Sequence, residues 1–439
     1  MAQPNKTRVQ VATDPAFSNV VHDVEGAYTT ALQIAEDVLP KGQNLYARGM
    51  HGHPTTGDSS WSTTVQFQIK LAWSDWDGSA NGLEYNLNSV MTAYVTTVTI
   101  SPNKVLVFNN SYGVSGLYAN LVTLNGSVMT IGDTIQCNNT GSAYLSVVAI
   151  SETQVIITYH AYNINGYLYA LLITINGDTV TVGTPVQCNG LNSIYISNVK
   201  LSPTEVLVCY RYESQAGYLY AQLLTISGAT ITVGALAQCN SVNSVYISAV
   251  AVSPTKVIVC YNKYAVGGVL SGGYLNTLLL TVSGTTITAG VPVQCNGVYS
   301  AYVSAVTLTE NRVLVCYRDG DNTTKYLYAT LISITGTILA PLHTLQLSMD
   351  STDYIWLVGI SETQALVCYR NNSDNGYLYS TVLTIVSDTV AVNERIQCND
   401  SPTGGWTHYD INAVKVGDNV FVAYNKGPNT TLYGKVLVG

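Results

Sequence analysis

Hydrophobic and polar positions alternate in short blocks along most of the chain, and the blocks recur. A tyrosine, a Val-rich segment, a Gly-Tyr-Leu-Tyr-type segment and a Thr-rich segment follow one another at intervals of 50 to 56 residues. The tyrosine that opens each unit occurs at Tyr94, Tyr144, Tyr195, Tyr246, Tyr302, Tyr354 and Tyr409. Self-similarity at a fixed period is the signature of repeat architectures. The pattern therefore predicts seven structural repeats.

Each repeat is expected to form four β-strands, as the third repeat illustrates. Its four segments are Tyr195–Leu201, Val206–Arg211, Gly217–Ile226 and Thr230–Gln238. Ser-Pro-Thr and Ser-Gly turns separate them, as expected for strands punctuated by turn residues. The apolar runs are nearly continuous, which favours sheets that are covered on both faces.

Four strands and about 50 residues per repeat resemble a β-propeller. The resemblance covers residues 81–439 and implies an all-β propeller of seven four-stranded blades. The chain ends in TTLYGKVLVG, which matches the third strand of a repeat, whereas residues near 80–88 match the fourth. An N-terminal strand is therefore expected to complete the last blade and close the ring, which removes exposed sheet edges.

Residues 1–70 do not share the period. Leu39-Pro40, Tyr46-Ala47-Arg48 and the GDSSWS segment that begins at Gly57 resemble the later strands of a fibronectin type III module. The resemblance implies a small β-sandwich that lacks its first two strands. The module is either reduced or completed by strands of a partner chain, which would be an assembly mechanism; a spacer that packs on the propeller is the alternative. Residues 71–80 would be the connector.

Charge is scarce, which narrows the classes of partner. Only 10% of the residues are charged, against about 25% in an average domain, and the formal net charge is −8. An acidic balance argues against a nucleic-acid partner. No run of 18 apolar residues exists, so no transmembrane segment is predicted. The first ten residues lack the pattern of a secretory signal.

The nine cysteines fall into two recurring motifs. Five lie in Gln-Cys-Asn and four in Val-Cys-Tyr, all at apolar strand positions. The count is odd, so at least one thiol is free. No CxxC pair is present, which removes support for a zinc site. We expect small buried side chains.

Motifs of catalysis are missing from the sequence. It contains no HExxH, GxSxG or P-loop motif, and none of the Ser-x-Asp-x-Gly-x-x-Trp boxes of sialidase-type propellers. His51 and His53 could bind a metal, but a solvated loop is the simpler interpretation. Asp319–Asn322 is interpreted as a turn, because the full calcium-loop spacing is absent. The sequence thus predicts no enzyme, no cofactor and no metal site.

Variable loops on one face are the candidate binding region. In a four-stranded meander, the loops between the second and third strands and between repeats emerge on the same face, and function on rigid scaffolds lies on such loops. Tyrosine rings together with amide or guanidinium donors suit sugar recognition. The residues could instead pack between blades. The candidate ligand-binding residues are Arg211, Arg318, Arg370, Asn189, Asn240, Asn296, Trp406 and His408.

These observations favour a non-enzymatic binding or structural protein of the extracellular space or a virion surface. The propeller would display repeated loops to a surface glycan or host receptor, and residues 1–70 would contact a virion or assembly partner. A soluble multivalent bacterial lectin and an intracellular protein-interaction scaffold are the alternatives, and a glycan-cleaving enzyme is a third. A lectin should bind sugar at several sites per chain, a scaffold should bind protein, and an enzyme needs paired carboxylates.

Overall fold

The computed structural model divides the chain into two compact units, Met1–Trp76 and Asp77–Val438. The structure describes residues 6–12, 14–18, 20–27, 44–53, 57–58, 65–68, 84–111, 116–126, 128–264, 273–320, 324–399, 402–403, 411–426 and 431–437. The predicted connector 71–80 lies outside these residues. The predicted boundaries at 70 and 81 therefore stay predictions.

The described strands of the first unit form one antiparallel sheet in the order β2-β1-β3-β4, with β5 also paired to β3. Its strands are β1 (Lys6–Ala12), β2 (Val20–Ala27), β3 (Asn44–His53), β4 (Gly57–Asp58) and β5 (Val65–Gln68). Arg48 packs over the ring of Phe17 at 4.2 Å and donates through Nη2 to Gln10 at 2.8 Å. A fibronectin type III module is a sandwich of two sheets, so the predicted resemblance is not supported.

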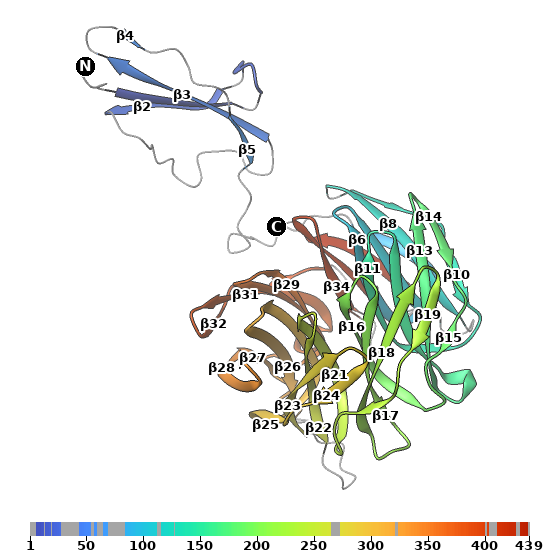
Figure 1. Ribbon diagram of the computed structural model, residues 1–439. Helices are drawn as coiled ribbons and strands as arrows, with labels where there is room; N and C mark the ends of the chain where they lie inside the picture. Colours follow the sequence, from blue (N-terminus) through green and yellow to red (C-terminus); the bar gives the residue numbers. More distant parts are fainter. Residues whose placement is uncertain are drawn as a thin grey trace. The chain divides into compact units, whose positions relative to one another are not determined.

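Sheets arranged around an axis make up the second unit (Figure 1). Three of them have five strands each. They are β11 (Ser142–Ser151), β12 (Gln154–Ala161), β13 (Tyr167–Asn176), β14 (Thr179–Val182) and β15 (Val186–Gln187); β16 (Ser193–Ser202), β17 (Glu205–Tyr212), β18 (Tyr218–Ser227), β19 (Thr230–Val233) and β20 (Ala237–Gln238); and β29 (Thr352–Ser361), β30 (Gln364–Asn371), β31 (Tyr377–Val386), β32 (Thr389–Val392) and β33 (Ile396–Gln397).

Two further sheets have eight strands each. The first contains β6 (Tyr85–Ser101), β7 (Lys104–Ser111), β8 (Leu117–Asn125), β9 (Val128–Ile131), β10 (Ile135–Asn138), β34 (Ile411–Val416), β35 (Asn419–Lys426) and β36 (Thr431–Leu437). The second contains β21 (Asn243–Ser253), β22 (Lys256–Tyr264), β23 (Gly273–Ser283), β24 (Thr286–Ala289), β25 (Val293–Thr309), β26 (Arg312–Asp319), β27 (Leu327–Thr335) and β28 (Ile338–Ser348).

The predicted propeller is confirmed, but the count of seven separate blades is not. The described strands of the second unit form five hydrogen-bonded sheets, because β6 and β25 each run through 17 residues and pair in two repeats. At its beginning, strand β23 pairs with Tyr299 and Ser300 of β25, which is also the next inner strand. The corresponding strand β18 pairs with β20 and not with the next inner strand. The seven repeats persist as a ring of inner strands, each contacting the next. These are β6, β11, β16, β21, β25, β29 and β34, and the last contacts the first.

The ring closes as the sequence predicts. The first part of β6 pairs with β36, with Tyr85 opposite Gly434 and Asn86 opposite Tyr433. The remainder of β6 pairs with β7. The beginning and the end of the propeller chain therefore share one sheet, and neither leaves an unpaired edge at this point.

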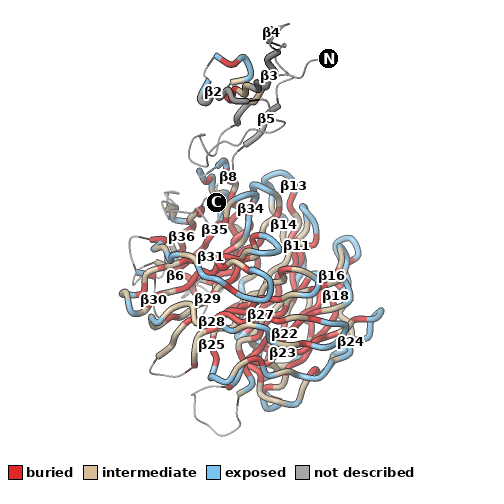
Figure 2. The backbone as a smooth tube through the Cα atoms, turned by 90° about the vertical axis from the view of Figure 1, so that its left-hand side faces the viewer, coloured by how far each residue is buried: buried red, intermediate tan, exposed pale blue. Residues whose placement is uncertain are grey.

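Apolar burial is concentrated in the second strand of each repeat. Val206, Leu207, Val208, Cys209 and Tyr210 of β17 are all fully buried. Their side chains alternate between the two faces of the sheet, so both faces are covered by neighbouring repeats. Figure 2 shows the contrast between these buried strands and the exposed turns and outer strands. Two short 3-10 helices, Tyr162–Ile164 and Asn372–Asp374, occur in the described part of the chain, where no helix is long and apolar enough to span a membrane.

Candidate functional site

The repeat tyrosines lie together on the inner strands. Five of them have a left-handed backbone with φ between 48° and 53°, namely Tyr144, Tyr195, Tyr246, Tyr302 and Tyr354. Each lies where the pairing of the inner strand with the second strand shifts register, as between Ala143 and Ser146. Such a bulge re-aims a side chain. A left-handed non-glycine residue costs about 1–3 kcal/mol, and such residues cluster at functional sites.

Adjacent rings contact one another around the axis. The six described tyrosines, Tyr94 and the five above, are called the tyrosine ring here; Tyr409 lies outside the described residues. Centroids of successive rings are 5.1 to 5.4 Å apart. All six side chains are half-buried. Tilted aromatic contacts at this distance are favourable.

A central cavity of about 210 Å³ lies beside the tyrosine ring. Its walls are the four residues that begin with the tyrosine in each of six inner strands, together with Ile411 and Asn412. Small-molecule sites usually measure about 300–1,000 Å³, so this cavity can enclose only part of a ligand. Any larger ligand must therefore contact the mouth.

Burial keeps the tyrosine hydroxyls protonated. Desolvation raises the pKa of Tyr94, Tyr195 and Tyr302 well above the ordinary value. Neighbouring phenols raise it further, and at Tyr302 the carboxylate of Asp353 does so first. Tyr144 and Tyr246 are shifted in the same direction, mainly by burial. At neutral pH these groups can donate and accept hydrogen bonds, but they do not supply a phenolate.

One position near the end of the second strand carries a polar side chain in every repeat. The residues there are Asn110, His160, Arg211, Asn262, Arg318, Arg370 and Asn425. His160 Nδ1 donates to the carbonyl of Ser193 at 2.9 Å, and Asn425 Nδ2 donates to that of Thr92 at 3.2 Å. Asn262 Nδ2 makes the equivalent bond to Ser300. Each acceptor lies two residues before the tyrosine of the next repeat, so this position joins neighbouring repeats.

The three arginines predicted as ligand-binding occupy this same position. Arg211 forms an ion pair with Glu213 at 3.0 Å, and Arg318 pairs with Asp353. The guanidinium of Arg318 also lies 4.7 Å from the centre of the Tyr302 ring, a cation–π distance. The Nε atoms of all three, Arg370 included, are buried and have no hydrogen-bond partner among the described residues.

The predicted asparagines hold loops in place. Asn189 Nδ2 donates to the Tyr210 hydroxyl at 2.9 Å, and its Oδ1 accepts from the amide of Leu191 at 2.9 Å. The Oδ1 atoms of Asn240 and Asn296 accept from the amides of Leu219 and Leu275. The side-chain amides of the three asparagines are thus hydrogen-bonded within the chain, which weighs against contact with a ligand. Their binding role stays a prediction. Trp406 and His408 lie outside the described residues.

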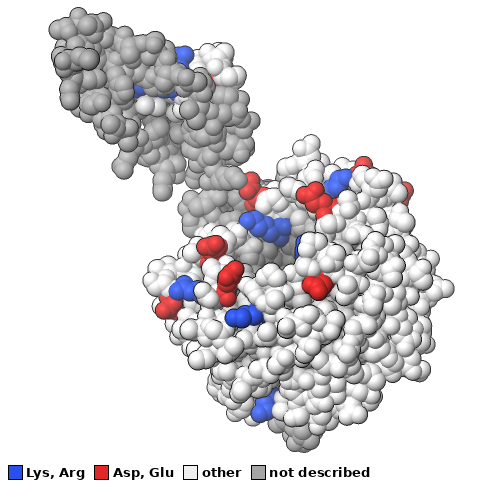
Figure 3. Space-filling view, viewed as in Figure 1, with Lys and Arg blue, Asp and Glu red and all other residues white. Residues whose placement is uncertain are grey.

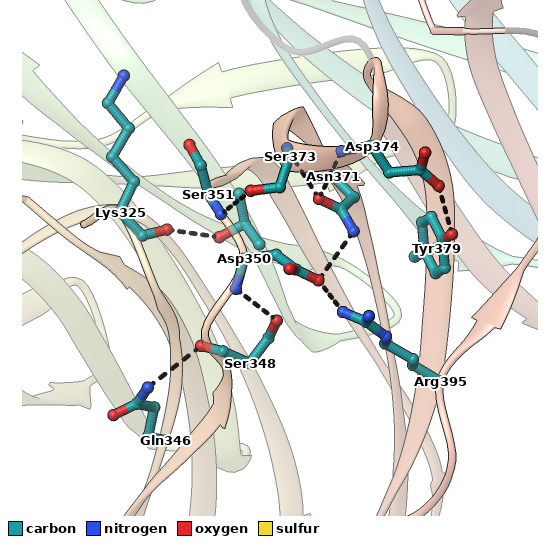
Figure 4. A network of polar contacts seen from close by, with 11 residues as sticks. Lys325, Gln346, Ser348, Asp350, Ser351, Asn371, Ser373, Asp374, Tyr379 and Arg395 are labelled. Atoms are coloured by element: carbon teal, nitrogen blue, oxygen red, sulfur yellow. Dashed lines mark hydrogen bonds and ion pairs between the residues drawn. The ribbon is translucent and has the colours of Figure 1, made fainter. Parts of the chain in front are cut away.

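A charged network lies between the fifth and sixth repeats (Figure 4). Asp350 pairs with Arg395 and accepts from Asn371 Nδ2 at 3.0 Å. Asn371 Oδ1 in turn accepts from the amides of Ser373 and Asp374. Figure 3 shows that most of the few charged side chains on the face in view lie around a hollowed region, with a few others toward the edges. The network fixes loop geometry, because its members mostly bind one another.

The cysteines match the prediction of small buried side chains. All nine are free and buried. Desolvation raises the pKa of Cys137 and Cys188 to about 12, which keeps the thiols protonated. In the described part of the chain, no three His, Cys, Asp or Glu side chains gather in a way that could hold a metal. The prediction that His51 and His53 lie in a loop is wrong, because both belong to strand β3, where His51 is opposite Thr7. Their side chains are outside the described part of the structure, so the metal question stays a prediction.

Comparison with solved structures is informative about the fold alone. No protein-family model and no curated protein matches the chain. The periplasmic gluconolactonase of Pseudomonas aeruginosa superposes with a TM-score of 0.50 at 12% identity over 80% of this chain and 97% of that one. The fold is that of a β-propeller.

Other solved propellers match less well. The microbial sialidase Hz136 has a TM-score of 0.45 at 11% identity, covering 84% of this chain and 88% of its own. A variant of the Aleuria aurantia lectin, solved with α-methyl-L-fucoside, has a TM-score of 0.44 at 12% identity, covering 73% and 99%. One propeller fold hosts unrelated functions, so the site itself must carry the argument.

Proposed function

We propose that the propeller is a non-enzymatic binding module that recognises carbohydrate at the face bearing the tyrosine ring. The observation that carries the proposal is the ring of six half-buried, neutral tyrosines around the central cavity, flanked by guanidinium and amide groups. Aromatic faces pack against the C–H faces of sugars, and fixed donors and acceptors bind hydroxyls. Their recurrence in successive repeats surrounds one cavity with several such contacts.

The groups at the cavity support binding in preference to catalysis. They are phenols with raised pKa values, serine and threonine hydroxyls and amides, which exchange hydrogen bonds more readily than protons. The arginine position supplies fixed cations beside the rings. We further propose an extracellular or virion-surface setting, with residues 1–70 as an assembly contact; these remain predictions from the sequence, as do the bacterial-lectin and intracellular-scaffold alternatives.

A glycan array followed by calorimetric titration of the hits tests the proposal. Arg318→Met removes the guanidinium over Tyr302 and should weaken a glycan hit at least tenfold. The matched control is Arg312→Met, because Arg312 belongs to the same strand β26 but binds Asp388 at 2.7 Å at the opposite end. Saturable binding that only Arg318→Met weakens supports the proposal. Absence of binding to any glycan overturns it in favour of a structural role.

A further inference from the structure

The fourth repeat breaks a pattern that five of the other six repeats keep; in the first repeat Asn109 is opposite Tyr118. In five repeats a tyrosine of the second strand stacks on a tyrosine of the third strand, with ring centroids 5.8 to 6.5 Å apart. In the fourth repeat Tyr261 faces Asn276 in the equivalent pair of β22 and β23. The aromatic ring that covers this position elsewhere is therefore missing.

The missing ring also removes a hydrogen bond. Tyr169, Tyr220 and Tyr328 of the third strands each donate to the Oε1 of a glutamine in the fourth strand, at 3.1 to 3.2 Å. The glutamine of the fourth repeat is Gln294, which is opposite Asn276. Asn276 instead donates to the carbonyl of Tyr274 at 2.9 Å. Gln294 Oε1 therefore lacks the tyrosine hydroxyl that Gln187, Gln238 and Gln346 receive.

The surroundings of Tyr261 are otherwise those of its counterparts. Asn240 Nδ2 donates to Ser244 Oγ at 2.9 Å. Asn138 and Asn296 make the same bond in their repeats, at 3.2 and 2.6 Å. The fourth repeat therefore differs at Asn276, which takes the place of a tyrosine.

A groove lies at this place. It measures about 480 Å³, within the usual range for small-molecule sites. Tyr261 and Asn276 line it together with Lys263, Gln294 and the loop that follows Asn240. None of its residues lines the central cavity. The groove is therefore separate from the central cavity, and it lies between the end of the third repeat and the strands of the fourth.

Lys263 gives the groove a positive charge. Its side chain is exposed, and no carboxylate pairs with it among the described residues. The adjoining segment 265–272 contains no Asp or Glu in the sequence. An ammonium without a partner at the rim of a polar groove attracts an anionic group.

We propose that the groove of the fourth repeat binds a pyranose that carries a carboxylate. Its ring lies against Asn276, where other repeats have a tyrosine, its hydroxyls bond to Gln294 Oε1, and its carboxylate meets Lys263. This inference rests on the proposed carbohydrate-binding function and adds to it a second site and a sugar class.

The test uses the full chain and calorimetric titration with galacturonic acid and N-acetylneuraminic acid, with galactose as the neutral comparison. One acidic sugar should bind more tightly than galactose. Asn276→Tyr restores the tyrosine of the other repeats, so it should weaken this binding at least tenfold while the melting temperature holds or rises. Lys263→Met should also weaken it, whereas Lys256→Met, at the other end of β22, should not.

Two outcomes overturn the inference. They are the absence of acidic-sugar binding to the wild-type chain, and binding by Asn276→Tyr at wild-type affinity. Gln294→Ala provides a second variant at an exposed position, with an expected loss of at least threefold. These outcomes are separate from the Arg318 experiment at the tyrosine ring, so the proposed function can hold while this site fails.

Discussion

Left-handed backbones occur at the ring tyrosines of five repeats and at a glycine that opens the third strand in three of them, and they serve different ends. The left-handed backbone of the ring tyrosines is strained, and it sets the direction in which their side chains point. Gly166, Gly217 and Gly376 have φ values of 74° to 80° and leave room for the side chain beside them, respectively His160, Arg211 and Arg370. The tyrosine ring and its polar neighbours therefore depend on residues with positive φ, namely the tyrosines themselves and the glycines beside His160, Arg211 and Arg370.

Gly217→Ala should destabilise the protein strongly. A Cβ there would lie 2.5 Å from Arg211 Nε and 2.4 Å from Asn243 Oδ1, in addition to the left-handed backbone. The expected loss of unfolding free energy is about 2–4 kcal/mol, combining strain with steric displacement. Gly228→Ala is the matched control, because Gly228 has φ +60° and no atom within 4 Å of a Cβ. Equal losses in urea denaturation would contradict the argument.

His160 should make the free energy of unfolding depend on pH. Burial lowers the pKa of His160 below its ordinary value of 6.5, against a smaller opposing effect of the bond to Ser193. The unfolded chain therefore binds more protons than the folded one in the window below about pH 6.5, so stability falls as the pH drops through the folded pKa. His160→Asn keeps an amide donor, as Asn262 does in its repeat.

Urea denaturation at pH 7.5 and pH 5.0 measures this effect. The wild type should lose more unfolding free energy between the two pH values than His160→Asn. An identical loss in both proteins would show that other groups set the acid sensitivity.

At the scale of single elements, alternation in the sequence predicts three of the four strands well. Tyr195–Leu201, Val206–Arg211 and Gly217–Ile226 correspond to β16, β17 and β18 within about two residues. The expected fourth strand is instead two short strands, β19 and β20. Gly234 lies between them, and its amide donates to the carbonyl of Leu223 at 2.8 Å, where a Cβ would approach that carbonyl to 2.9 Å.

The candidate site could be predicted in part. Strand direction correctly groups the three arginines at one end of their strands, since that argument needs only an antiparallel meander. The sequence analysis did not recognise that His160 and the asparagines occupy the same position as those arginines. The residue types differ, and their common hydrogen bond to the next repeat is visible only in the structure. The groove of the fourth repeat had a signal in the sequence, namely Asn276 where other repeats have tyrosine, but its meaning depends on the cross-strand register.

At the scale of the whole molecule, hydrogen bonds between inner strands join the repeats into a ring. Ser146, Ser197, Ser248 and Ser304 each accept through Oγ from a backbone amide of the next inner strand, at 2.8 to 3.0 Å. In the sixth repeat Trp356 takes this position, and its Nε1 donates to the carbonyl of Ala413 at 2.7 Å. Asn412 completes the series by accepting from the amide of Thr97 at 3.0 Å and from its hydroxyl at 2.6 Å.

Asn412→Ala should therefore loosen both ends of the propeller chain at once. Asn412 is buried, so the variant leaves two donors of Thr97 without a partner, at a cost of about 2–4 kcal/mol. Hydrogen exchange should accelerate in β34 and also in β6, although Asn412 and Thr97 are 315 residues apart in sequence. Ser197→Ala is the comparison, because it removes one such bond between consecutive repeats and should affect β16 and β21 only. If Asn412→Ala accelerates exchange in β34 but leaves β6 protected, the ring is held closed by the pairing of β6 with β36 and not by this contact between inner strands.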